Sequence, residues 1–137
     1  MQLPFHDNSF NFGIMQAFLT VLFEPEEHIE VLKESSRVLK PKGKLYISEF
    51  CKTWDSPKYR ERYIAGFEVT GYVATFPVLD AYSNRILYYA HHFSEHELFD
   101  ILNYAGFNVI QSRNTKFLTK SGNTINGIVI IAQNKKI

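Results

Sequence analysis

One stretch of the chain, Leu3 to Phe50, constrains the fold more than any other. It contains an apolar segment at Asn11–Met15, an amphipathic segment at about Glu24–Leu39 and a second apolar segment at Lys44–Phe50. The pattern predicts a strand, a helix and a strand, and a crossover helix of this length requires the two strands to lie parallel in one sheet. We therefore expect an α/β fold organised around this βαβ unit.

The predicted crossover helix has recognisable ends. Pro25 suits the first turn, and Glu24, Glu26 and Glu27 lie at the positive end of the helix dipole. A tight turn at residues 41–44, which contain a proline and a glycine, is predicted to stop the helix. We expect this helix to be structural, with His28 on its solvated side.

Ligands of parallel α/β sheets bind outside the carboxyl ends of the strands. In this chain those ends are Met15-Gln16-Ala17 and Ser48-Glu49-Phe50. The amide of Gln16 both donates and accepts hydrogen bonds, so it either contacts a ligand or satisfies backbone groups of the loop. The carboxylate of Glu49 has three interpretations: it orients a substrate or acts as a base, it caps a helix, or it forms an ion pair.

The middle of the chain predicts a helix followed by a hairpin. The later part of Cys51–Ile64 is predicted to be helical, and Glu68–Phe93 alternates around a turn at Asp80–Asn84. We interpret residues 65–93, approximately, as a β-hairpin inserted between strands of the main sheet.

The last third of the chain predicts one helix and two strands. Ser94 and Glu97 form a capping box that opens a helix over Ser94–Ala105. Strands at Asn108–Leu118 and Thr124–Gln133 then form an antiparallel hairpin. The second strand contains the continuously apolar run GIVIIAQ, which predicts burial on both of its faces.

Composition limits the function classes. The 137 residues suit one domain, and a net charge of +1 provides no bulk-charge argument for nucleic acid or an anionic membrane. The single cysteine, Cys51, excludes an intrachain disulfide and suits a reducing compartment. No apolar run approaches the length of about 20 residues that spans a bilayer, and no signal-peptide pattern is present. We expect a soluble, cytoplasmic protein.

The adjacent pair His91-His92 raises the question of a metal site. Neighbouring side chains on an extended segment point to opposite faces, so the pair is poorly placed to chelate one ion. With one distant cysteine there is also no zinc spacing, and we expect no metal. One histidine is a candidate for holding a substrate hydroxyl or accepting a proton, and the other for core packing.

Five motifs, in order, resemble the class I S-adenosylmethionine-dependent methyltransferases. They are LPF at Leu3–Phe5, DNSF at Asp7–Phe10, RVLKP at Arg37–Pro41, GKLYISEF at Gly43–Phe50 and HHFSEHELFDILNYAGFNV at His91–Val109. The resemblance covers most of the chain. It implies the latter half of a Rossmann-like methyltransferase sheet, with parallel strands, a C-terminal antiparallel hairpin and an inserted β-hairpin lid.

The resemblance also implies roles for particular residues, with S-adenosylmethionine as the cofactor. Gln2 and Leu3 would lie against the adenine ring, and Met15, Gln16 and Ala17 against the methionine portion. Insertions such as residues 65–93 cover the active site in the family and select a small-molecule substrate. The candidate pocket and catalytic residues around this lid are Tyr63, Tyr72, Tyr88 and Tyr89, with Glu49, His91 and His92.

The family's glycine-rich loop and its ribose-binding acid precede the LPF motif, which begins here at Leu3. We therefore expect residues 1–137 to be a partial, truncated domain that binds the cofactor weakly or not at all by itself. Three functions follow: methyl transfer to an unidentified small molecule, a non-catalytic remnant that binds partners or dimerises through the exposed edge of the Asn11–Met15 strand, and RNA modification. The near-neutral charge argues against RNA.

Overall fold

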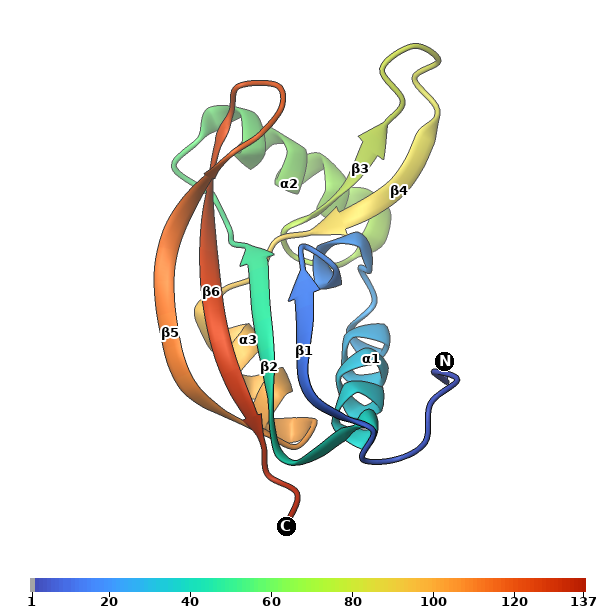
Figure 1. Ribbon diagram of the computed structural model, residues 1–137. Helices are drawn as coiled ribbons and strands as arrows, with labels where there is room; N and C mark the ends of the chain where they lie inside the picture. The colour runs from blue at the N-terminus through green and yellow to red at the C-terminus, as the bar shows by residue number, and fades with distance from the viewer. Residues whose placement is uncertain (1) are drawn as a thin grey trace.

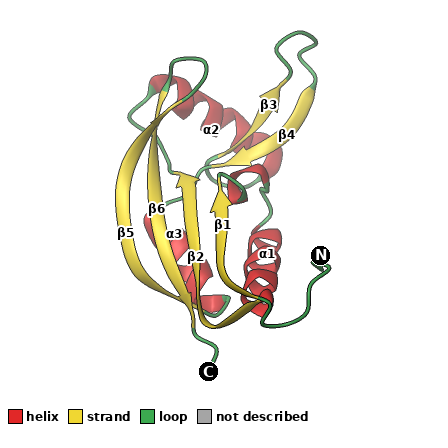
Figure 2. Cartoon of the chain, in the orientation of Figure 1, coloured by secondary structure: helices red, strands yellow, loops and turns green. Residues whose placement is uncertain are grey.

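The computed structural model describes residues 2–137 and has the predicted α/β architecture (Figures 1 and 2). In chain order its elements are β1 (Phe10–Gln16), the short 3-10 helix η1 (Leu19–Val21), α1 (Pro25–Val38), β2 (Leu39–Phe50), α2 (Pro57–Thr70), β3 (Thr75–Leu79), β4 (Ile86–His91), α3 (Glu95–Tyr104), β5 (Phe107–Leu118) and β6 (Thr124–Asn134).

The main sheet has four strands in the order β1-β2-β6-β5. Strands β1 and β2 are parallel, which confirms the βαβ unit, and β6 runs antiparallel to both β2 and β5. Met15 pairs with Ile47 and Gln16 with Ser48. The backbone N–H of Ala17 then donates to the carbonyl oxygen of Ser48 over 2.7 Å. The carboxyl ends of β1 and β2 are therefore side by side, as the sequence predicts.

The junction of α1 with β2 differs from the prediction. The helix ends at Val38, and β2 begins immediately at Leu39, so residues 41–44 form an irregular part of the strand and not a separate turn. Lys42 has a φ of 61° there, and the pairing register shifts between Phe10 and Phe12. A Cβ at Gly43 would lie 2.8 Å from the carbonyl oxygen of Lys40. The extra residues are therefore accommodated by a bulge that requires glycine.

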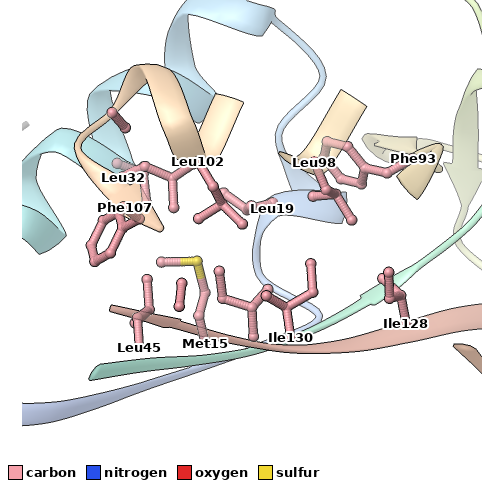
Figure 3. Close-up of a cluster of buried hydrophobic side chains, with 14 of the residues drawn as sticks. Met15, Leu19, Leu32, Leu45, Phe93, Leu98, Leu102, Phe107, Ile128 and Ile130 are labelled. Atoms are coloured by element: carbon pink, nitrogen blue, oxygen red, sulfur yellow. The ribbon is translucent and has the colours of Figure 1, made fainter. Parts of the chain in front are cut away.

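The main hydrophobic core lies between the sheet and the two helices on one face, α1 and α3 (Figures 1 and 3). Leu32 of α1, Leu98 and Leu102 of α3, and Ile47 and Ile130 of the sheet are completely buried. Each such side chain contributes about 1.5–3 kcal/mol through its burial. This core fixes both helices against the strands whose ends carry the candidate site.

The prediction that β6 is buried on both faces is wrong. Ile128, Ile130 and Ala132 face the helices and are completely buried, whereas Val129 and Ile131 are only half-buried. The physical reason is that α1 and α3 both pack on the same side of the sheet (Figure 1).

A second, aromatic core joins α2 to the hairpin β3–β4. Tyr59 and Tyr63 of α2 pack with Phe76 of β3, and Phe50 at the end of β2 packs against this cluster. Strands β3 and β4 form a separate two-stranded antiparallel sheet, so the hairpin is confirmed. It projects beyond the main sheet, and its turn is exposed (Figure 1).

The start of the hairpin is later than predicted. Residues 68–70 belong to α2, although the β-branched Val69 and Thr70 favour a strand. The helix continues until Gly71, whose φ of 76° ends it. One turn earlier, Gly66 lies against β3 so closely that a Cβ there would approach the carbonyl oxygen of Thr75 to 1.7 Å.

Helix α3 begins as the capping box predicts. The backbone N–H of Glu97 donates to the hydroxyl oxygen of Ser94 over 3.1 Å. The carboxylate of Glu97 turns to His91, so only half of the box is made. None of the helices within residues 2–137 is both long and apolar enough to cross a bilayer.

Candidate functional site

A groove of about 490 Å³ runs along β1 and the facing side of α1. This volume lies in the range of small-molecule sites, about 300–1,000 Å³. The lining is mostly apolar, with Gln16 and Ser35 as its polar side chains. Three predicted cofactor residues, Leu3, Met15 and Gln16, line this one groove. Gln2 and Ala17 do not line it, and Gln2 is exposed.

An ion-pair network on α1 positions the loop that carries Leu3. The backbone N–H of Leu3 donates to Glu34 over 2.6 Å, and the guanidinium of Arg37 donates to the Leu3 carbonyl oxygen over 3.1 Å. Arg37 also pairs with Glu34 at 2.6 Å and with Asp7 at 2.8 Å. Hydrogen bonds from Arg37 and Leu3 lower the pKa of Glu34 to about 2. The loop is thus attached to the helix that forms one wall of the groove.

The loop after β1 is held by Glu49. The Glu49 carboxylate is completely buried and accepts hydrogen bonds from the backbone N–H groups of Leu19, at 2.7 Å, and Thr20, at 3.1 Å. Burial raises the pKa of Glu49 to about 7, against the opposing effect of these amide donors. Glu49 does not line the groove. Its contacts are those of a cap on η1, one of the three interpretations that the sequence leaves open.

The two histidines of β4 face different clusters. His91 Nε2 lies 2.9 Å from a carboxylate oxygen of Glu97, and its Nδ1 lies 3.0 Å from the hydroxyl oxygen of Thr75. On the opposite face, the hydroxyl oxygen of Tyr63 lies 2.5 Å from His92 Nδ1, within hydrogen-bond distance. Burial lowers the pKa of His92 to about 3, so the ring is neutral near pH 7. Neither histidine lines the groove.

The comparisons with known proteins agree with this geometry. A family model described as a methyltransferase domain matches residues 1–47. A solved structure of an S-adenosylmethionine-dependent methyltransferase from Methanosarcina mazei is 40% identical over 99% of this chain, with a TM-score of 0.93. These similarities support assignment to the class I S-adenosylmethionine-dependent methyltransferase family. No curated protein sequence matches it.

Other methyltransferases share the fold over less of their own length. A Thermotoga maritima protein, named a possible histamine N-methyltransferase, is 25% identical with a TM-score of 0.57. A Burkholderia thailandensis 1,6-didemethyltoxoflavin-N1-methyltransferase, solved with its substrate and S-adenosylhomocysteine, is 18% identical with a TM-score of 0.62, a likeness of fold alone. These two matches include 98% and 96% of the residues of the present chain. It spans 64%, 60% and 46% of the three proteins, in the order given.

The four tyrosines predicted to line a substrate pocket lie in three places. Tyr63 is buried in the aromatic core, with 1% of its surface exposed. The rings of Tyr72 and Tyr89 lie 6.0 Å and 5.3 Å from the ring of Phe23. Tyr88 is exposed on the hairpin. No single cavity described for residues 2–137 is lined by all four.

The expectation that His28 is solvated is wrong, because only 2% of this residue is exposed. Its Nε2 lies 2.6 Å from the carbonyl oxygen of Leu22 and 3.1 Å from that of Leu19. Burial lowers the pKa of His28. The available signal was its position one turn before Leu32, on the apolar side of α1.

Two further polar features of the chain bear on chemistry. Burial raises the pKa of the free thiol of Cys51 to about 11, so the thiol is not an activated nucleophile. Within residues 2–137, no three His, Cys, Asp or Glu side chains converge as metal ligands would.

Proposed function

We propose that this chain functions in methyl transfer from S-adenosylmethionine to a small-molecule acceptor. The observation that carries the proposal is the convergence of Leu3, Met15 and Gln16 in one groove, which runs along β1 and reaches its carboxyl end. The 40% identity to the Methanosarcina mazei methyltransferase supports it. Ligands of parallel α/β sheets bind outside the carboxyl ends of the strands, and Met15 and Gln16 lie at that end of β1.

The residues of the groove fit part of this cofactor. Apolar side chains such as Leu3 and Met15 suit the adenine ring and the carbon chain beside the sulfur, and the amide of Gln16 suits a polar group at their edge. No acidic side chain lines the groove within the described residues, so a partner for ribose hydroxyls is not among its walls. The predicted weak binding by these 137 residues follows from this partial fit.

When bound, S-adenosylmethionine supplies a methyl group that is already electrophilic, because it is attached to a sulfonium. The task of the chain is to exclude water and to align the acceptor. Such alignment lowers the activation free energy by several kcal/mol, and by about 7–11 kcal/mol in the best intramolecular reactions. Glu49 assists by holding η1, and hence the segment that follows Gln16, in one position. We assign no general base, because the neutral ring of His92 is already hydrogen-bonded to Tyr63 and the Glu49 carboxylate is already hydrogen-bonded to two backbone amides of η1.

The test is a titration of the 137-residue chain with S-adenosylmethionine, followed by amide NMR. We expect weak, saturable shifts concentrated at Leu3, Met15 and Gln16. Gln16→Ala and Phe18→Ala should weaken the binding, because both side chains line the groove. Phe67→Ala, an equally exposed aromatic position on α2, is the matched control. Shifts concentrated at other residues would contradict the proposed groove. The absence of any saturable shift at cofactor concentrations well above the millimolar range would contradict it as well.

The open edge of β1 supports a second function, homodimerisation. Phe12 and Ile14 are 53% and 69% exposed, and the seven residues of β1 include no charge. The other edge strand, β5, carries Arg113 and Lys116, which is how exposed edges are usually protected. Antiparallel pairing of two β1 strands about Gly13 would place Phe12 of each copy against Ile14 of the other.

Light scattering tests the dimer. We expect a concentration-dependent dimer that Ile14→Lys abolishes, with Ile110→Lys, at an exposed isoleucine on the other edge strand, as the control. A monomer at all concentrations would contradict this second proposal and leave the first untouched.

A further inference from the structure

A second, smaller cavity lies behind η1, where the start of α1, the hairpin and α3 meet. Its volume is about 140 Å³, and it shares no lining residue with the groove along β1. Aromatic walls and polar side chains converge on it, and those used below are Phe23, His28, Lys52, Tyr72 and Glu97.

His28 presents one unused hydrogen-bond acceptor to this cavity. Its Nε2 is directed at the carbonyl oxygens of Leu22 and Leu19, so this nitrogen carries the proton and Nδ1 is an acceptor. No side chain or backbone group in the described chain bonds Nδ1. Every completely buried side-chain nitrogen or oxygen among these residues has a partner, so Nδ1 is open to the cavity.

Glu97 and Lys52 supply opposite charges to the same space. The Glu97 carboxylate accepts from His91 Nε2 at 2.9 Å and 3.1 Å, which leaves about half of its lone-pair positions free. Burial raises the pKa of Glu97, but the hydrogen bond and charge of His91 outweigh it and keep the pKa below its usual value. The ammonium of Lys52 has no hydrogen-bond or ion-pair partner within residues 2–137.

We propose that this cavity binds a small zwitterion, an α-amino acid of the size of glycine or alanine. Its ammonium group would donate to Glu97 and to His28 Nδ1, and its carboxylate would accept from Lys52. The rings of Phe23 and Tyr72, whose centroids lie 6.0 Å apart, pack on each other and form the aromatic wall of the cavity. The cavity volume of about 140 Å³ is sufficient for a molecule of this size.

The charges of the cavity suit a zwitterion better than they suit an amine alone or a carboxylate alone. A simple amine leaves Lys52 beside an apolar group, and a simple carboxylate is repelled by Glu97 and offers no donor to His28. The site is independent of the proposed methyl transfer, because no residue of the groove takes part in it.

The experiment is a titration of the 137-residue chain with glycine, observed through the ring nitrogens of His28 by NMR. We expect a saturable shift of Nδ1, the nitrogen that gains a hydrogen bond. Glu97→Gln and Lys52→Met should each weaken binding by about tenfold or more, because each removes a charge-assisted hydrogen bond. Glu95→Gln and Lys58→Met, exposed positions of the same charges, are the matched controls.

Methylamine and acetate serve as half-ligands, and each should bind at least about tenfold more weakly than glycine. The proposal is overturned if the ring nitrogens of His28 show no saturable shift when the glycine concentration is raised well above the millimolar range. It is also overturned if acetate binds as tightly as glycine, which would make the cavity a plain anion site, or if the variants match their controls. Native-like spectra of the variants without glycine show that the fold is retained.

Discussion

The main sheet and the unit formed by α2 with the hairpin are held together in different ways. The main core is aliphatic and lies under two helices, with residues such as Ile47 and Leu102 completely buried. The α2–hairpin unit is aromatic, and its central contact is a polar one, Tyr63 with His92. The comparison teaches that the sheet depends on a continuous apolar pattern, whereas the smaller unit depends on a few individual contacts.

The largest effect is expected in the main core. Leu102→Ala should destabilise the chain by about 2–5 kcal/mol, because it leaves a cavity between α3 and the sheet. Denaturant unfolding followed by circular dichroism measures this loss. Leu118→Ala, at a leucine that is 76% exposed, is the control and should change little. Equal losses from the two substitutions would erase the distinction between a buried core and the surface.

A smaller effect is expected where α2 meets β3. Gly66→Ala should cost about 3 kcal/mol, because the new methyl group would overlap the carbonyl group of Thr75 and the backbone must separate. Trp54, the single tryptophan, packs on Tyr63 at 4.9 Å and reports on this unit by fluorescence. Ala65→Ser, at the neighbouring exposed position, is the control. An unchanged Trp54 signal in Gly66→Ala would show that the close approach is not required.

Next in size is the polar contact of the aromatic core. Tyr63→Phe should cost about 1–3 kcal/mol, because it leaves the N–H of Thr53 and the Nδ1 of His92 without their partner. The measurement is the thermal unfolding of the Trp54 fluorescence signal. Tyr88→Phe removes an exposed hydroxyl and is the matched control. If both variants unfold alike, packing of the ring alone accounts for the role of Tyr63.

The smallest effect is a pH dependence that separates the two regions. The pKa of His92 is lowered to about 3, so the unfolded state binds the proton first and stability falls as the pH drops from about 6.5 towards 3. At pH 5.5 the loss is about 1 kcal/mol. The pKa of Glu49 is raised to about 7, so the folded state binds the proton first and this carboxyl adds stability as the pH falls from about 7 towards 4.5.

Acidification should therefore change the Trp54 fluorescence before the circular dichroism of the main sheet changes. His92→Asn should remove much of the early fluorescence change, and His96→Asn, at a histidine on the surface of α3, should leave it in place. Coincident transitions of both probes at every pH would show that the two regions unfold as one unit.

Several elements were predictable because their signals are local. The capping box of Ser94 and Glu97 marks the start of α3, and the turn at Asp80–Asn84 marks the hairpin. Other features were missed because local propensity was overridden. Val69 and Thr70 favour a strand, yet they extend α2, because the helix stops only at Gly71.

For the candidate site, sequence reasoning located the groove better than it located the catalytic candidates. Leu3, Met15 and Gln16 lie together because the order of strand, helix and strand brings their segments to one edge. The partners of Glu49, by contrast, are amides 29 and 30 residues away in a 3-10 turn with no sequence signature.

The amino-acid sequence by itself determined the βαβ unit, the start of α3, the opposite faces of His91 and His92 and the C-terminal hairpin, because periodicity, caps and turns act over a few neighbouring residues. Only the tertiary structure decided the burial of His28, the one-sided burial of β6 and the extension of α2 to Thr70. Those features depend on which distant surfaces pack together, and burial then sets which polar groups must find partners.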